Sequence, residues 1–156
     1  MATPSSPKAA KTVPLEQFLT YRLHLVNKLT DKHSSDAYAI ELGLAVGEAR
    51  CLAAIGNALS SKNSLSINEL AAGSNLNKAQ ASRAAQALVA RGLAVKASNE
   101  VDGRGVAVSL TDAGAALWQQ VMQLIAKRNE SIFSCLTEAE QTQLGSMLDK
   151  IAQNAR

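Results

Sequence analysis

The spacing of two helix starts limits what this chain can fold into more than any other feature. SINE at 66–69 and NKAQ at 77–80 each place a capping side chain three residues ahead of a Glu or Gln, which is typical of a first helical turn. The first helix, INELAAGS, is therefore short, and about three or four residues, 73–76, join it to the helix KAQASRAAQALVAR. Two helices joined so tightly are expected to form a helix-turn-helix.

An alternating region follows the second of these helices. Gly92 is placed to end that helix, after which LAVKAS (93–98) and VAVSLT (106–111) alternate as half-buried strands do. NEVDGRG (99–105) joins the two strands, and Gly103 and Gly105 allow a sharp turn within it. The order helix, turn, helix, strand, loop, strand predicts a winged helix, with this hairpin as its wing.

Helical periodicity predicts most of the remaining chain, so we expect a mainly α fold of six to seven helices. Apolar residues at helical spacing predict a first helix over 15–32, and Ser34-Ser35-Asp36 predict the N-cap of a second that ends near Gly43. Further helices are expected over 46–59, 112–136 and 138 to the end. We expect one domain over 15–156, with its winged helix at about 46–111, preceded by a flexible tail over 1–14 that holds all three prolines.

Composition excludes several classes of protein. The hydrophobic fraction of 47% is that of a globular chain, and no apolar run approaches the roughly 18 residues that cross a bilayer. Without a signal peptide, we expect a cytoplasmic location. His24 and His33 are too far apart for a shared metal site, and Cys51 and Cys135, which have no metal spacing, are interpreted as small buried hydrophobes. No nucleophile–base pair is found, so we expect no enzyme activity, no metal and no cofactor.

The positive charge of the chain is concentrated around the predicted wing. Residues 77–104 hold five basic and two acidic side chains, whereas the rest of the chain holds eleven of each. The whole net charge of +3 therefore lies in this segment. A basic segment on an otherwise neutral body favours a polyanionic partner such as DNA.

The helix after Asn77 has two different faces. Its inner stripe is predicted to be apolar and small: Ala81, Ala84, Ala85 and Leu88. Its outer face carries Ala79, Ser82, Arg83 and Gln86 at spacing i, i+3, i+4, i+7. Gln86 suits adenine, Ser82 a base edge or phosphate, and Arg83 guanine or phosphate. Such a face alone also suits an ordinary solvated helix, but the tight turn and the wing favour entry into a DNA major groove.

The wing supplies the second predicted DNA contact. Arg104 at its tip suits the negative potential of a minor groove, while Asp102 is repelled by DNA and is expected to pair with Arg104 and direct it. The complete set of predicted DNA-binding residues is Ser66, Asn77, Lys78, Ala79, Gln80, Ser82, Arg83, Gln86, Asp102 and Arg104.

The chain resembles the MarR family of transcription regulators from residue 15 to 151. The resemblance lies in GLAVGEARCLAAI, NKAQASRAAQALVARGLAV, LTEAEQTQLGSMLDKI, and DGRGVAVSLTDAG with its Asp-x-Arg wing and Leu-Thr-x-x-Gly. It implies an obligate homodimer formed by helices at about 15–33 and 112–155. It also implies a repressor that binds double-stranded DNA, and that a small molecule releases. An inverted-repeat operator follows from the two-fold symmetry.

Arg22 is the first candidate anchor for such a molecule. It lies among apolar residues in YRLHL, where it could pair with an acid of a partner subunit or line a ligand pocket beneath the DNA-binding lobe. Looser candidates for the same pocket are Tyr21, His24, Tyr38 and Arg50. Guanidinium binds carboxylate in a bidentate way, and the family's effectors are often phenols or aromatic acids. We therefore expect a small aromatic acid or phenol, in a pocket that Ala49 enlarges where relatives often carry an aromatic residue.

Two other interpretations stay open at this point. One is an oxidant-sensing regulator of the same fold that uses Cys51 or Cys135 as its switch. The other is a winged helix that serves only protein association, or an enzyme.

Overall fold

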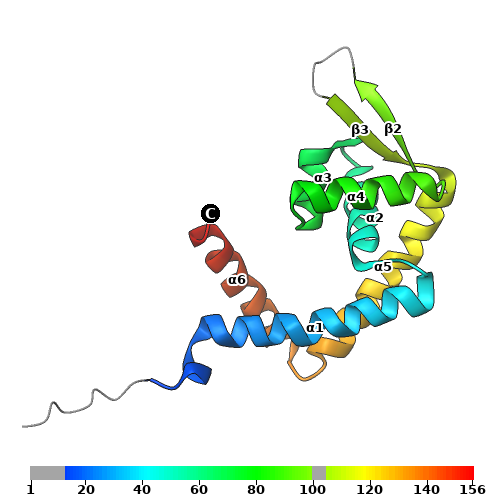
Figure 1. Cartoon of the computed structure of the whole chain (residues 1–156). Coiled ribbons are helices and arrows are strands. Elements are labelled where there is room, and N and C mark those ends of the chain that lie inside the picture. Colours follow the sequence, from blue (N-terminus) through cyan, green and yellow to red (C-terminus); the bar gives the residue numbers. More distant parts are fainter. Residues whose placement is uncertain (1–12, 100–104) are drawn as a thin grey trace, which may run out of the picture. The chain divides into compact units, whose positions relative to one another are not determined.

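The computed structural model describes residues 13–99 and 105–156 of the chain (Figure 1). The chain divides into two compact units, Met1–His33 and Ser34–Arg156. In the first unit, a 3-10 helix, η1 (Leu15–Gln17), precedes the start of helix α1 (Leu19–Leu42), which runs on into the second unit. The tail predicted over 1–14 lies outside the described residues, apart from Val13 and Pro14, which are exposed.

Helix α1 is continuous where the sequence predicted a break. Ser34 and Asp36 do not cap a new helix; they lie inside α1, so the helices predicted over 15–32 and from 34 to near 43 are one element from Leu19 onward, and Leu15–Gln17 form the separate η1. Neither Gly nor Pro interrupts this segment, and Ser or Asp inside a helix costs at most about 0.7 kcal/mol relative to Ala. Ser34 is buried and accepts a hydrogen bond from Arg128 of helix α5 (Asp112–Phe133). This packing offsets the weak local preference for a cap.

Helix α1 ends at Leu42, in agreement with the predicted end near Gly43. The amide of Gly43 donates to the carbonyl of Ala39 at 3.1 Å, and that of Leu44 to the carbonyl of Tyr38 at 3.0 Å. Gly43 has φ +62, a conformation that glycine adopts without steric cost. Leu44 is 1% exposed, so the chain enters its core directly after this turn.

The predicted winged helix is confirmed, and we call residues 44–111 the winged-helix lobe. Its elements are, in order, α2 (Val46–Ala58), β1 (Leu65–Ser66), α3 (Ile67–Ser74), α4 (Lys78–Ala90), β2 (Ala94–Asn99) and β3 (Gly105–Leu110). Residues 75–77 join α3 to α4, and Asn75 turns the chain there in the left-handed conformation, φ 53. This is the tight connection that the two capping boxes predicted.

The sheet of the lobe has one strand more than the predicted hairpin. Its antiparallel strands lie in the order β1-β3-β2, with Lys96 opposite Val108 and Val108 opposite Leu65. Strand β1 has only two residues, which is too short to produce an alternating pattern. Ser66 serves both as its last residue and as the N-cap of α3.

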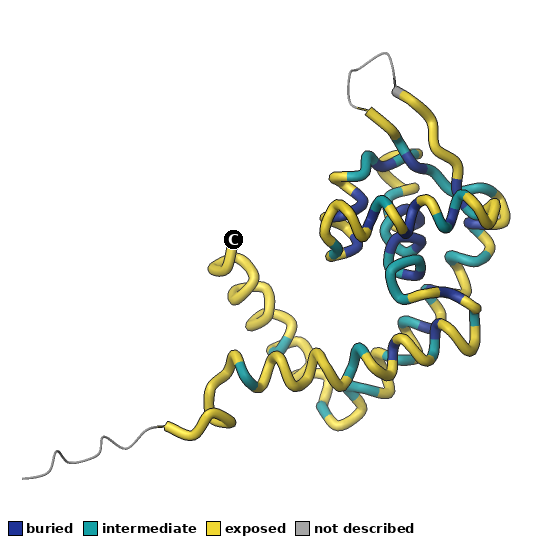
Figure 2. The backbone as a smooth tube through the Cα atoms, viewed as in Figure 1, coloured by how far each residue is buried: buried dark blue, intermediate teal, exposed yellow. Residues whose placement is uncertain are grey.

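The buried side chains of the described residues lie mostly in the lobe (Figure 2). Those that are large and less than 2% exposed are Leu44, Cys51, Leu52, Ile55, Leu70, Leu88, Val108 and Val121. All but Val121 of α5 come from the lobe itself. The lobe therefore has a hydrophobic core of its own, onto which α5 adds.

Two glycines allow helix α5 to approach the lobe closely. A Cβ atom on Gly56 of α2 would overlap the indole ring of Trp118, and one on Gly114 would overlap the carbonyl oxygen of Leu93. Thr111 caps α5 by accepting a hydrogen bond from the Gly114 amide at 3.1 Å. The Leu-Thr-x-x-Gly segment thus joins the end of the sheet to α5 through a cap and a close backbone contact.

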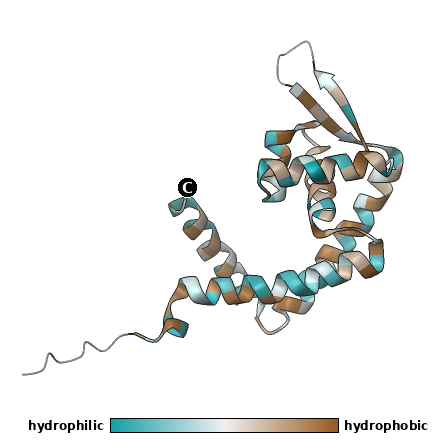
Figure 3. Cartoon of the chain, viewed as in Figure 1, coloured by the Kyte–Doolittle hydropathy of each residue, from teal (hydrophilic) through white to brown (hydrophobic). Residues whose placement is uncertain are grey.

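Helix α6 (Glu138–Asn154) completes the described chain. Thr137 and Glu140 form its predicted capping box. None of its residues is buried, although it carries hydrophobic residues along its length (Figures 2 and 3). Within the described residues, no helix is both long and apolar enough to span a bilayer.

Candidate nucleic-acid interface

Helix α4 presents the two faces that its sequence predicted. Ala81, Ala84, Ala85 and Leu88 are buried against the lobe, at 8% exposure or less. Ala79, Arg83 and Gln86 are exposed on the other side, and Ser82 is half-buried. Three alanines in the inner stripe allow α4 to lie close to α2 and α3. The outer face is left to polar and cationic side chains.

The first turn of α4 is fixed by a reciprocal cap. The Oδ1 atom of Asn77 accepts from the Gln80 amide at 2.8 Å, and the Oε1 atom of Gln80 accepts from the Asn77 amide at 3.0 Å. These acceptors are therefore engaged within the helix, while the NH₂ groups of both side chains can donate outward. Lys78, the first helical residue, is exposed beside them.

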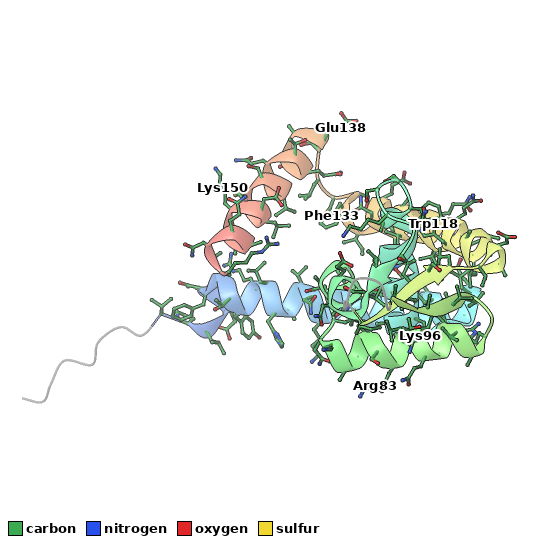
Figure 4. All side chains as sticks on the ribbon, turned by 90° about the horizontal axis from the view of Figure 1, so that it is seen from above. Arg83, Lys96, Trp118, Phe133, Glu138 and Lys150 are labelled. Atoms are coloured by element: carbon green, nitrogen blue, oxygen red, sulfur yellow. The ribbon has the colours of Figure 1, made fainter. Side chains whose placement is uncertain are left out.

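Two cationic side chains extend this surface. Figure 4 labels Arg83 on α4 and Lys96 on β2. Both are exposed, and among the described residues neither forms an ion pair. The predicted set of DNA-binding residues did not include Lys96, although the local charge count did. Its exposure is not marked in the sequence, because the alternating pattern predicts one covered face, whereas residues 95–98 of the edge strand β2 are all exposed.

Ser66 lies at the start of α3 in a cap that involves charge. Its hydroxyl accepts from the Glu69 amide at 3.2 Å, and the Glu69 carboxylate accepts from the Ser66 hydroxyl and amide, both at 2.9 Å. The ammonium of Lys62 also donates to this carboxylate. These contacts, the Lys62 hydrogen bond first, lower the pKa of Glu69 to about 2. Ser66 therefore has a structural role as a cap, and its predicted contact with DNA stays a prediction.

The tip of the wing lies outside the described residues. Asp102 and Arg104 belong to that segment, so their predicted pairing and groove contact stay predictions. Strands β2 and β3, which lead to the tip and back, are paired as far as Asn99 and Gly105. Gly105 has φ +78, consistent with the sharp turn that the two glycines predicted.

Arg91 is not one of the cations available to a polyanion, although its charge suggested that it would be. It was counted in the basic segment, but its Nη1 atom donates to Glu48 at 2.9 Å and to the carbonyl of Gly43 at 3.0 Å. The positive charge that α4 and β2 present to a polyanion therefore comes from Lys78, Arg83 and Lys96.

Three of the candidate ligand residues belong to the first unit of the chain. Arg22 and His24 are exposed, and Tyr21 is half-buried. The Nε atom of Arg22 donates to the carbonyl of Glu16 in η1 at 2.9 Å. This bond accounts for one of the five guanidinium N–H groups and leaves the paired nitrogens able to bind a carboxylate.

The other two candidates, Tyr38 and Arg50, belong to the second unit. Tyr38 is 5% exposed, and the Arg128 guanidinium lies over its ring, 5.6 Å from the ring centre. Arg50 lines a pocket of about 440 Å³ between the first turns of α2 and the helix α4. Arg83 and Gln80 line the same pocket, whose remaining walls are mostly small or apolar.

The two cysteines differ, and the interpretation of both as buried is wrong for one of them. Cys51 is fully buried, and burial raises the pKa of its thiol, partly opposed by a hydrogen bond with Ser74. Cys135, between α5 and α6, is exposed. Because α5 ends at Phe133 and none of α6 is buried, no element of the described chain covers this position.

Comparison with known proteins identifies this architecture. The model of the MarR family matches residues 42–105, which contain α2 to β2 and the wing. A MarR/EmrR family transcriptional regulator from Acinetobacter sp. ADP1 is 27% identical, with a TM-score of 0.76 over 92% of this chain and 98% of that one. A MarR-family transcriptional regulator from Silicibacter pomeroyi is 25% identical, with a TM-score of 0.76 over 92% and 93%.

The chain resembles MarR-family transcriptional regulators, in sequence over its winged helix and in fold over nearly its whole length. These two similar structures are those of transcriptional regulators. The match covers nearly the whole length of these relatives, so helices α1, α5 and α6 are part of the shared architecture.

Two further comparisons delimit this assignment. Bordetella bronchiseptica BpsR has the same fold, with a TM-score of 0.78 over 90% of this chain and 97% of that one, at 19% identity. Its DNA binding is described as regulated by 6-hydroxynicotinic acid. No curated protein sequence is significantly similar to this chain.

Proposed function

We propose that this protein is a homodimeric repressor, released from an inverted-repeat operator by a small aromatic acid or phenol. The outer face of α4 carries the proposal. It presents Lys78, Ser82, Arg83 and Gln86 on the second helix of a helix-turn-helix, while the inner face is fully packed. Side chains of this kind read base edges and phosphates in a major groove.

The wing adds a contact on the neighbouring groove. Strands β2 and β3 lead to the segment that contains Asp102 and Arg104, and Lys96 is exposed on β2. Arg104 enters a minor groove in this proposal, with Asp102 directing its guanidinium. Arg104→Ala is then expected to cost about 1–3 kcal/mol of operator affinity, and Asp102→Ala less, because it removes only the directing partner.

Exposed apolar surface supports the dimer. Large hydrophobic side chains of the first unit are 42–71% exposed: Val13, Leu15, Phe18, Leu19, Leu23, Leu25, Val26 and Leu29. Met147, Leu148 and Ile151 of α6 are exposed in the same way. Apolar surface of this extent is typical of obligate interfaces. A second copy of the chain is the occupant that a two-fold operator requires.

Two guanidinium groups support an aromatic acid as the effector. Arg22 has nitrogens available beyond its bond to Glu16, and Arg50 lines a pocket with Arg83. A cation next to small apolar walls suits the carboxylate and ring of an aromatic acid. The neighbour BpsR responds to 6-hydroxynicotinic acid, which belongs to this class.

Selection of bound fragments from the source genome tests the DNA-binding part. We expect a single inverted repeat whose half-sites are centred about one helical turn, roughly 34 Å, apart. Repeating the selection with Ser82→Ala and Gln86→Ala is expected to change the preferred bases. A uniform loss for all sequences would instead assign these residues to phosphates, and a site without two-fold symmetry would contradict the dimer.

Titration of the operator complex tests the effector. The panel comprises benzoates, cinnamates, pyridine carboxylates and phenols, with wild type, Arg22→Ala and Arg50→Ala. We expect at least one acid to release wild type, and one of the two variants to need a higher concentration. A complete reversal from 99:1 requires about 5.5 kcal/mol of differential affinity, which two sites per dimer can share. If no compound releases wild type, the proposed class is wrong.

A further inference from the structure

We propose that Arg91 and Glu48 form a clamp that sets the position of α4 relative to the end of α1, and that Arg91 acts through this clamp rather than on DNA. The proposal rests on the proposed function, because it assigns a task to α4 as the DNA-reading helix. It concerns residues 34–156, which form one compact unit.

A single guanidinium nitrogen joins three helices. Arg91 is the C-cap residue of α4, and its Nη1 atom donates to the carboxylate of Glu48 at 2.9 Å and to the carbonyl of Gly43 at 3.0 Å. Glu48 lies in the first turn of α2, and Gly43 directly follows Leu42, the last residue of α1. The end of α4 is thereby bonded to the connection between α1 and α2.

The chemistry of both acceptors favours a cation at this point. The carbonyl of Gly43 lies at the C-terminal end of α1, where the helix dipole is negative and the last carbonyls lack partners within the helix. The side chain of Glu48 is only 16% exposed, against 40% for Arg91. A carboxylate with so little contact to water depends on its charged partner more than a surface carboxylate does.

The clamp also holds the connection itself. The oxygen of Glu48 that binds Arg91 accepts a hydrogen bond from the Ala45 amide at 3.4 Å. Arg91 therefore binds the carbonyl of Gly43, and Glu48 binds the amide of Ala45, at the two ends of this short connection. Gly43 has open space around its Cβ position, so its own position is not restricted by packing, although Leu44 beside it is buried. The hydrogen bonds to Arg91 and Glu48 engage the Gly43 carbonyl and the Ala45 amide, in addition to the bonds that the Gly43 and Leu44 amides donate to α1.

This geometry separates Arg91 from the other cations of its segment. Lys78, Arg83 and Lys96 are exposed and form no ion pair within the described residues. A phosphate contact by Arg91 would compete with Glu48, and it would leave a carboxylate with little solvent access unpaired. A clamp predicts that Glu48 matters for operator binding as much as Arg91 does. A phosphate contact predicts the opposite, because Glu48 repels DNA.

The experiment measures operator affinity as a function of salt for Glu48→Gln, Arg91→Gln and the double variant. Lys96→Gln serves as the example of a lost surface cation, and Lys127→Gln, on the exposed side of α5, as a matched charge control. We expect each clamp variant to bind the operator about tenfold more weakly. The double variant should be no weaker than either single one, because both remove the same interaction. The slope of log affinity against log salt should stay at the wild-type value for the clamp variants.

Two further measurements test the clamp: a conservative variant of Arg91 and hydrogen exchange without DNA. Arg91→Lys retains a cation within reach of Glu48 and is expected to recover part of the lost affinity. Hydrogen exchange of the DNA-free full chain should show faster exchange at Leu44 and Ala45 in both clamp variants. This exchange readout does not depend on DNA, so it separates failure of the clamp from failure of the proposed function.

Two results would overturn the proposal. The first is a lower salt slope for Arg91→Gln together with unchanged or tighter binding by Glu48→Gln, which would make Arg91 a phosphate contact. The second is unaltered operator affinity in both variants, which would make the ion pair a feature of stability alone.

Discussion

Helices α4 and α6 both begin with a capping box and both carry an apolar stripe, but only α4 buries its stripe within the chain. The stripe of α4 is 8% exposed or less, because α2, α3 and the sheet cover it. In α6, Met147, Leu148 and Ile151 are 41–48% exposed. Similar local sequence signals therefore lead to different burial, and the difference comes from what the rest of the chain can place against each helix.

The lobe and helix α6 therefore differ in what stabilises them. The lobe has a closed core, so its fold depends on contacts within one chain. Helix α6 lacks such cover, and most of the stability of a protein helix comes from packing of its apolar face. Its stability must come from another surface, which the proposed second copy supplies. The predictions below test this division, from the largest expected effect to the smallest.

A charge on α6 should have the largest effect. Ile151→Glu introduces a carboxylate into the stripe, and in a symmetric dimer it enters the interface twice. We expect dimer dissociation to be favoured by about 3 kcal/mol or more, over a hundredfold, with operator affinity lost in parallel. Gln153→Glu is the matched control on an exposed polar position of the same helix. Sedimentation equilibrium measures the dissociation, and an unchanged dimer in Ile151→Glu would remove α6 from the interface.

A methyl group added to a glycine should have opposite effects on stability at the packed start of α5 and in the uncovered helix α6. Gly114→Ala places a Cβ atom against the Leu93 carbonyl, and we expect a loss of about 3 kcal/mol in the free energy of unfolding. Gly145→Ala in α6 meets nothing within 4 Å in the chain, so we expect a gain of about 0.5–1 kcal/mol from helix propensity. Urea denaturation at fixed protein concentration measures both. A neutral Gly114→Ala would mean that the α5 start is not tightly packed.

Local rules predicted most of the lobe correctly. Capping boxes at Ser66 and Asn77, the stop at Gly92 and the strands after it each depend on neighbouring residues, which the sequence displays directly. The inner stripe of α4 was predicted for the same reason, since helical spacing alone defines it. The half-burial expected from the alternation is not found in β2, where residues 95–98 are all exposed.

The errors arose where distant residues decide the structure. The break predicted at Ser34 is absent because Arg128, 94 residues away, bonds its hydroxyl. The role of Arg91 was missed because its partners, Gly43 and Glu48, lie more than 40 residues away along the chain. Strand β1 is visible only through its pairing with β3. A sequence shows the charge of a residue but not the distant groups that engage it.

Removing the charge of Arg83 should affect DNA binding and leave the fold unchanged. Arg83 is exposed on the outer face of α4, so Arg83→Ala is expected to cost about 1–3 kcal/mol of operator affinity. The thermal midpoint should stay within error, because no packed contact is lost. Lys127→Ala removes a charge on α5 and controls for the general effect of net charge. A fall in thermal stability equal to that of a core substitution would mean that the two faces of α4 are not separate.

The smallest expected effect is a difference between the capping boxes of α3 and α6 in how stability depends on pH. Lys62 and Ser66 lower the pKa of Glu69 to about 2 from its ordinary value of 4.5. Hydrogen bonds from Thr137 lower the pKa of Glu140 in α6, without a cation. A carboxyl group with a lowered folded pKa contributes stability above its ordinary pKa, and this contribution is lost as pH falls toward the folded value. The stability of wild type should therefore decrease between about pH 4.5 and 2 in part through Glu69.

Glu69→Gln, which keeps the cap but not the charge, should flatten this decrease more than Glu140→Gln does. Urea midpoints across this pH range measure the difference. Equal flattening in both variants would show that Lys62 adds nothing to the cap of the lobe, and that the two helix starts differ only in what covers the helices behind them.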